Sequence, residues 1–223
     1  MSLLPILRDK TRLRALIVER LKGTRAHTDI ESAVEASARS SVNALVRQYL
    51  PETPAAAAVL VPIVDRDEGL TVLLTRRASH LRHHAGQISF PGGRVEPTDL
   101  DAFDAALREA HEEIGLPRER VELAGYLDPQ LVVSGFWVTP VVGFVEPGFA
   151  LTLDASEVES TFEVPLAHVL DPANHRPRER AFGTTTLRVY EIPFGPYNIW
   201  GATAAMLIEL YNVVSRREGA PAV

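Results

Sequence analysis

Residues 90–93 read Phe-Pro-Gly-Gly, and residues 107–116 read Leu-Arg-Glu-Ala-His-Glu-Glu-Ile-Gly-Leu. At about 100° per residue, the apolar positions upstream of Gly115 fall on one stripe of a helix that we expect to begin at Thr98 or Asp99. This stripe comprises Phe103, Leu107, Ala110 and Ile114. Gly115 is suited to end the helix, because a left-handed C-cap costs glycine least. The segment therefore predicts an amphipathic helix that follows a paired-glycine turn.

Three carboxylates occupy another face of the predicted helix: Glu109, Glu112 and Glu113. Their spacing of i, i+3 and i+4 places them within an arc of about 100°, so their oxygens are able to converge. Like charges at this spacing repel, and Mg²⁺, which prefers oxygen ligands, would offset the repulsion. Arg108 lies beside Glu112 on the helix and is placed to orient it. Taken alone, the glutamates are also compatible with a solvated acidic face.

Residues 76–84 hold six potential cations in nine positions and no carboxylate. Arginine offers a bidentate fork to phosphate, and histidine donates hydrogen bonds whether or not it is charged. Downstream, Gly92 and Gly93 permit a close approach of backbone to ligand. A solvated loop and an ordinary turn are the alternatives for these two features. Their succession before the glutamates indicates a phosphate clamp followed by a metal site.

The composition fits one folded domain with an extension. The chain has 223 residues, of which 46% are hydrophobic and 23% charged. Its net charge of −6 argues against coating nucleic acid, and the absence of cysteine excludes disulfides, thiolate zinc sites and a catalytic thiol. Pro51 and Pro54 separate an N-terminal helical extension, residues 1–52, from a domain over residues 53–223. We find no signal-peptide core or membrane-spanning run, and therefore expect a cytoplasmic protein that binds no membrane.

Several segments of the domain over residues 53–223 have the composition of β-strands. Residues 59–64 and 70–75 flank a turn composition and predict a hairpin. Further predicted elements are strands over 121–127, 137–145 and 187–192, and a closing helix over 198–214. The first fifty residues predict two helices, the second over 30–50. Residues 1–25 carry seven Lys or Arg against two acidic residues, a local charge of +5, which indicates either a solvated helix face or contact with an anionic partner or a membrane surface.

Gly93 through Leu116 resembles the Nudix box: Gly, five residues, Glu, seven residues, then Arg-Glu-apolar-x-Glu-Glu-x-Gly-apolar. Residues 108–116 match its second half at every specified position, whereas Asp99 replaces the first Glu and precedes Arg108 by eight intervening residues. Residues 73–93 are similar to the motif that precedes the box in the coenzyme A pyrophosphatase branch, roughly Leu-Leu-Thr-x-Arg, then Leu-Arg-x-His-x-Gly-Gln-x-x-Phe-Pro-Gly-Gly.

The resemblance implies a fold, a reaction and a cofactor. The fold is the Nudix α/β/α sandwich with a mixed β-sheet. The reaction is metal-dependent hydrolysis of the diphosphate bond of coenzyme A or acyl-CoA, which yields 4′-phosphopantetheine, or its acyl form, and adenosine 3′,5′-bisphosphate. The cofactor is Mg²⁺ or Mn²⁺, and a homodimer is an expected assembly because dimers are frequent in the family. ADP-ribose, a dinucleotide and a nucleoside triphosphate are alternative substrates. Two alternative functions are a non-catalytic module that senses a nucleotide and an interaction domain that works through the N-terminal helices.

The resemblance also assigns residues. The expected metal ligands are Glu109, Glu112 and Glu113, and the expected catalytic residues are Glu109, Glu112 and Arg108. The expected substrate-binding residues are Arg76, Arg77, Arg82, His84, Gln87, Gly92 and Gly93. The general base is either Glu109 or a later carboxylate, for which the candidates are Glu157, Glu159 and Glu163. Ser134 and Phe136 are candidates to line the pocket, with core packing as the alternative for Phe136.

Overall fold

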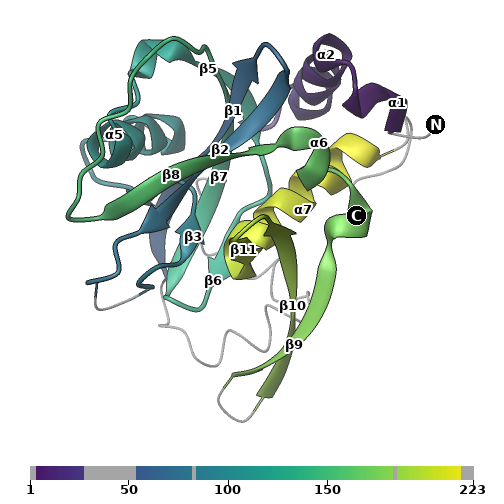
Figure 1. Ribbon diagram of the computed structural model, residues 1–223. Helices are drawn as coiled ribbons and strands as arrows, with labels where there is room; N and C mark the ends of the chain where they lie inside the picture. The colour runs from purple at the N-terminus through teal and green to yellow at the C-terminus, as the bar shows by residue number, and fades with distance from the viewer. Residues whose placement is uncertain (1–3, 28–53, 82–83, 183–184, 217–223) are drawn as a thin grey trace.

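The computed structural model describes residues 4–27, 54–81, 84–182 and 185–216 (Figure 1). Within them, an eight-stranded mixed sheet forms the centre of the fold; β1 and β7 are parallel, and the other paired strands are antiparallel. Its strands are β1 (Ala55–Arg66), β2 (Gly69–Arg77), β3 (Ile88–Ser89), β4 (Gly92–Arg94), β5 (Val121–Tyr126), β6 (Gln130–Val132), β7 (Phe136–Val145) and β8 (Val158–Pro165). The strand order is β3-β2-β1-β7-β5, with β4 on β1, β6 on β7 and β8 on β2.

Helices cover both faces of this sheet. One face carries α5 (Ala102–Ile114), whose Leu107, Ala110 and Ile114 pack into a core cluster with residues of β1, β2 and β7. The opposite face carries α2 (Lys10–Leu21), α6 (Leu166–Val169) and α7 (Gly201–Ser215), around a larger core cluster. Figure 1 shows α5 on one side of the strands and α2 and α7 on the other. The predicted α/β/α sandwich is confirmed.

A second, three-stranded sheet adjoins the α7 face. Its strands are β9 (Arg176–Phe182), β10 (Thr185–Phe194) and β11 (Tyr197–Trp200), in the order β11-β10-β9. Ile192 and Ile199 are paired across β10 and β11 and are fully buried in the larger core. The β9–β10 hairpin projects from the body of the molecule in Figure 1. Short 3-10 turns precede β5 and β9, at Arg118–Arg120 and Pro172–Asn174.

Most predicted elements are confirmed, including the β1–β2 hairpin, in which Arg66 pairs with Gly69. Three expectations are wrong in detail. Helix α5 begins at Ala102, because the side chain of Asp101 accepts the N-cap hydrogen bond from the N–H of Asp104. Residues 197–200 form β11 rather than the first turn of α7, since they pair with β10. The glycine pair lies in β4 rather than in a turn.

The N-terminal segment is part of the folded body. Short α1 (Leu4–Leu7) leads into α2, and Leu13, Ile17 and Leu21 of α2 are buried in the larger core. The basic face of α2 is partly ion-paired: Lys10 Nζ lies 3.0 Å from Asp65 Oδ1, and Arg14 Nη2 lies 2.7 Å from Glu122 Oε2. The helix predicted over residues 30–50 falls outside the described residues.

In the described part of the chain, no helix combines the length and the apolarity that crossing a lipid bilayer requires.

Candidate active site

Helix α5 presents its glutamates away from the core because its apolar stripe is buried beneath it. Leu107, Ala110 and Ile114 are buried, and Phe103 is partly buried against the same cluster. Gly115 ends the helix with φ at 67°, and its N–H donates to the carbonyl of His111 at 2.9 Å. A residue with a Cβ would be strained in this left-handed conformation. The predicted stripe and helix end are both confirmed.

The glycines of β4 are required by close packing. A Cβ on Gly92 would collide with the backbone carbonyl of Ala58 in β1, and Gly92 also has φ at 151°. A Cβ on Gly93 would lie only 2.5 Å from the carboxyl carbon of Glu109. A side chain at Gly92 would clash with backbone, whereas a side chain at Gly93 would have to displace the Glu109 carboxylate, which lies directly against β4.

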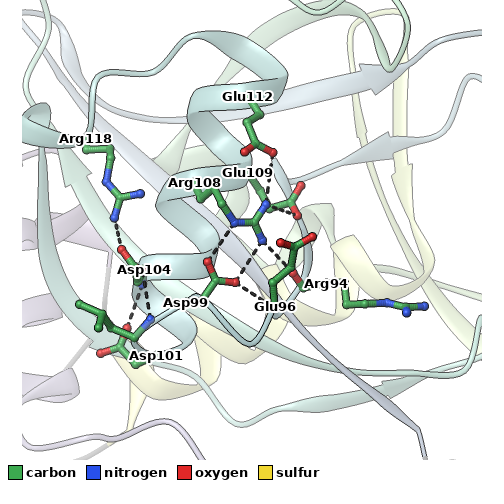
Figure 2. Close-up of polar contacts among 10 residues, drawn as sticks. Arg94, Glu96, Asp99, Asp101, Asp104, Arg108, Glu109, Glu112 and Arg118 are labelled. Atoms are coloured by element: carbon green, nitrogen blue, oxygen red, sulfur yellow. Dashed lines mark hydrogen bonds and ion pairs between the residues drawn. The ribbon is translucent and has the colours of Figure 1, made fainter.

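Arg108 lies at the centre of a polar network (Figure 2). Its guanidinium donates to both carboxylate oxygens of Asp99, at 2.9 and 3.1 Å, and to the carbonyl of Arg94 at 3.0 Å. Nη1 also donates to Glu109 at 2.9 Å and to Glu112 at 3.2 Å. The predicted contact of Arg108 with Glu112 is therefore present. The hydrogen bond from Arg108 is the largest cause of the lowered pKa of Asp99.

The bidentate ion pair between Asp99 and Arg108 was not predicted from the sequence. The Asp99 side chain is 2% exposed and also accepts a hydrogen bond from the N–H of Glu96 at 2.7 Å. Asp99 thus closes the loop between β4 and α5 and fixes Arg108 at the edge of the site. The sequence does mark this position as unusual, because Asp99 stands in place of Glu and is separated from Arg108 by eight residues rather than seven.

The three glutamates differ in burial. Glu113 is 4% exposed and accepts a hydrogen bond from the N–H of Gly92 at 3.3 Å, whereas the side chain of Glu112 is 57% exposed. Burial raises the pKa of Glu113 to about 8, with the Gly92 N–H opposing it and the negative charge of Glu157 adding to it. Burial also raises the pKa of Glu109, against the hydrogen bond from Arg108. Burial therefore disfavours the charged form of two of the three glutamates.

The donor set suits a hard divalent cation, although the oxygens are not gathered into a cage. Among the described residues, no three acidic or histidine side chains are arranged to hold a metal as they stand. The carboxylate of Glu112 accepts a hydrogen bond from Arg108 instead. The oxygens of Glu109 and Glu113, from the buried side of the same helix, are the ligands that Mg²⁺ prefers, and rotation of Glu112 about its side-chain bonds would add a third.

We call the cation-rich residues 76–84 the cationic loop. Arg77, near its start, is hydrogen-bonded to residues that directly precede β3. The N–H of Arg77 donates to the carbonyl of Gln87 at 2.9 Å, and the N–H of Gly86 donates to the carbonyl of Arg77 at 3.1 Å. His84 has φ at 57°, and its Nδ1 lies 2.8 Å from the side-chain oxygen of Gln87. Arg76 Nη1 lies 3.5 Å from Glu159. Arg82, predicted to bind substrate, lies outside the described residues.

The later carboxylates separate into three environments. Glu163 is held away from the site by Arg66, at 2.5 Å, and by Thr71. Glu159 is paired with Arg76. Glu157 is exposed and near the helix glutamates, because the preceding segment is bonded to the end of α5: the N–H of Asp154 donates to the carbonyl of Glu113 at 2.9 Å. Of the three candidates, Glu157 is the one that the fold brings to the site.

The chain is similar in sequence to proteins of one known family. The profile of the NUDIX domain matches residues 54–182. "Uncharacterized Nudix hydrolase NudL" of Enterobacter sp. (strain 638) is 45% identical over 155 residues, 69% of this chain and 80% of that protein. The protein of the same name from Salmonella paratyphi B is 46% identical over the same shares of the two chains. The crystal structure of a MutT/nudix family protein from Enterococcus faecalis is 19% identical, with a TM-score of 0.45 over 85% of this chain and 75% of that one.

Proposed function

The chain belongs to the Nudix family, and on that premise we propose that it hydrolyses the diphosphate bond of coenzyme A or acyl-CoA with the help of Mg²⁺ or Mn²⁺. The products would be 4′-phosphopantetheine, or its acyl form, and adenosine 3′,5′-bisphosphate. The family relation supports a hydrolase of nucleoside diphosphate derivatives. The choice of coenzyme A is our own inference from the residues that precede the helix.

One arrangement carries this proposal: the cationic loop is anchored directly beside the glycine strand. Arg76 pairs with Ile88 in the β2–β3 register, and the chain then continues through Phe90 and Pro91 into β4. Gly92 and Gly93 in turn contact Glu113 and Glu109. A diphosphate that lies against the glycines would therefore have arginine on one side and carboxylates on the other, as a metal-assisted attack on phosphorus requires.

The acidic and the basic residues of the site would have different roles. Glu109, Glu112 and Glu113 would hold the metal ion, which when bound draws charge from the diphosphate oxygens and makes a water more acidic. Arg77 and the loop residues His84 and Arg82 would bind phosphate oxygens through charge-assisted hydrogen bonds. Arg108 would position Glu109 and Glu112 rather than touch the substrate, since its donors already contact four neighbouring residues.

Glu157 and Glu109 are the two candidates for the general base. Glu157 is exposed and belongs to a different element from the metal ligands, so it is free to accept a proton from a water. Glu109 is held by Arg108 and lies against Gly93, which suits a ligand better. We therefore assign the proton transfer to Glu157.

Product analysis tests the proposal. We expect mass spectrometry to find 4′-phosphopantetheine and adenosine 3′,5′-bisphosphate from coenzyme A with Mg²⁺ present, and neither product when a chelator is added. A panel at equal concentration would include ADP-ribose, a dinucleotide and a nucleoside triphosphate. Faster hydrolysis of ADP-ribose than of coenzyme A would refute the assignment of substrate. Ligand binding without any turnover would favour the nucleotide-sensing alternative.

The proposal includes a homodimer, by analogy with the family. Sedimentation velocity of the full chain would test it, and a monomer at micromolar concentration would contradict it.

A further inference from the structure

Arg94 is an exposed arginine next to the glycine pair. It ends β4 directly after Gly93, and within the described residues its guanidinium has no hydrogen bond or ion pair. The guanidinium carbon lies 5.6 Å from the centre of the Phe136 ring. Figure 2 shows this side chain extending away from the carboxylates that surround Arg108. Arg94 therefore presents an uncommitted positive charge close to the active site.

Both members of this pair belong to strands that pair with β1. The carbonyl of Arg94 accepts a hydrogen bond from Arg108 at 3.0 Å, and Arg94 pairs with Ala57 in the β1–β4 register. Phe136 begins β7, pairs with Ala55 of β1, and packs partly buried against the larger core. A guanidinium above an aromatic face keeps its in-plane N–H groups free. The donors of Arg94 are therefore available to an anion.

Arg94 and the glutamates lie on opposite faces of the same short strand. Successive residues of a strand point to opposite faces, and Gly93 faces Glu109. Arg94 shares its face with Ala57, which belongs to the core on the α7 side. Among the described strands, β4 pairs with β1 alone. A ligand that lies along the other edge of β4 would reach the carboxylates on one face and Arg94 on the other.

Two other arginines near β4 are already paired with carboxylates. Arg108 is fully engaged by Asp99 and the helix glutamates, and Arg76 is paired with Glu159. The free fork of Arg94 matches a phosphate in shape and in charge. Because Arg94 lies on the face opposite the carboxylates, a phosphate bound to it would be a different one from the diphosphate that is cleaved.

We propose that Arg94, supported by Phe136, binds a phosphomonoester on the nucleoside half of the substrate. The proposal rests on the function proposed above, in which that group is the 3′-phosphate of coenzyme A. It makes Arg94 a residue that determines specificity, because a substrate without the extra phosphate would gain nothing from it.

Calorimetric titration with two probes tests this assignment. Adenosine 3′,5′-bisphosphate and adenosine 5′-monophosphate differ by one phosphate group, and both are titrated with Mg²⁺ present. We expect the wild-type protein to prefer the bisphosphate, and Arg94→Met to reduce that preference by about 10- to 100-fold while leaving the monophosphate affinity unchanged. Methionine retains an aliphatic side chain over Phe136. Arg118→Met, which removes an arginine paired with Asp104, is the matched control and should leave the preference intact.

The outcomes separate the two proposals. An unchanged preference in Arg94→Met, an equal loss of affinity for both probes, or no preference in the wild-type protein would each overturn the role of Arg94. If the preference depends on Arg94 but coenzyme A is not hydrolysed, the phosphate site stands and the substrate assignment is wrong. Hydrolysis provides a second readout: the ratio of kcat/KM for coenzyme A to that for 3′-dephospho-coenzyme A should fall in Arg94→Met to the same extent as the binding preference.

Discussion

Two arginine–carboxylate clusters in this protein have opposite charge balances. In the helix cluster, Arg108 forms ion pairs with Asp99, Glu109 and Glu112. In the hairpin cluster, Glu191 of β10 accepts from Arg180 at 2.9 Å and from Arg178 at 3.4 Å. One arginine meets three carboxylates in the first cluster, and two arginines meet one carboxylate in the second.

One glutamate in each cluster has a shifted pKa, and the two shifts are in opposite directions. The pKa of Glu191 is lowered, first by the hydrogen bond from Arg180 and then by that from Arg178, against its desolvation. In the helix cluster, burial outweighs the hydrogen bond from Arg108, and the pKa of Glu109 is raised. The hairpin cluster is thus satisfied by its own residues and holds β9 to β10. In the helix cluster the charged form of Glu109 is disfavoured, and a bound cation would offset that cost, as is typical of a binding site.

Neutralising one glutamate in each cluster should give the largest contrast. We expect Glu109→Gln to lower kcat for coenzyme A by about 10²-fold or more, because a metal ligand is removed. The metal-free protein should not be destabilised, since burial raises the pKa of Glu109 and so already disfavours its charged form in the folded state. Glu191→Gln should leave kcat unchanged, because Glu191 belongs to the second sheet. Steady-state kinetics and urea unfolding of both variants check the pair, and comparable loss of activity in the two would refute the division into site and scaffold.

Arg108→Lys should have the next largest effect. An ammonium group cannot reproduce the planar fork that contacts Asp99, Glu109 and Glu112 together, so the glutamates would lose their orientation. We expect kcat/KM to fall by about 10- to 100-fold, as for other residues that orient metal ligands. Raising the Mg²⁺ concentration should recover part of the loss. A variant with wild-type kinetics at all Mg²⁺ concentrations would show that the orientation of these carboxylates does not depend on Arg108.

The two clusters were not equally predictable from sequence. The helix glutamates and their apolar stripe repeat with helical period, so a single segment contains the evidence for both. The β1–β2 hairpin was also predictable, because its two strands and its turn are contiguous in the sequence. Asp99 was not, since its partner is reached through a non-helical loop whose path depends on Asp101 capping α5.

The hairpin cluster and the Arg94–Phe136 pair required the tertiary structure. Strand β9 alternates arginine with proline, glutamate and alanine, a pattern with no apolar face, and it forms because it pairs with β10. Strand β8 was missed as well, because its register with β2 joins residues far apart in the chain. Arg94 and Phe136 come from β4 and β7, which flank β1. No local pattern records such a contact.

Glu191→Gln should have a modest effect on stability. Glu191 is mostly buried, while Arg178 and Arg180 remain about half exposed, so solvent screens part of their attraction. We expect the free energy of unfolding at pH 7 to fall by about 1–2 kcal/mol. Glu122→Gln, at an exposed carboxylate paired with Arg14, is the control and should change it by about 0.5 kcal/mol or less. Urea unfolding measures both, and equal values would mean that the hairpin cluster behaves as an ordinary surface pair.

The pH dependence of that stability difference sharpens the contrast further. Because the pKa of Glu191 is lowered in the folded protein from its ordinary value of 4.5, its carboxylate stabilises the fold fully above that value, where it is ionised in both states. As the pH falls below 4.5 and through the folded pKa, Glu191 takes up a proton and the contribution is lost. The difference between wild type and Glu191→Gln should therefore be constant from pH 7 to about pH 5 and shrink toward pH 3. Urea unfolding at each pH measures this difference. If it stays constant down to pH 3, Glu191 is not stabilised as an anion by Arg178 and Arg180, and the two clusters do not differ in the way their charge balance implies.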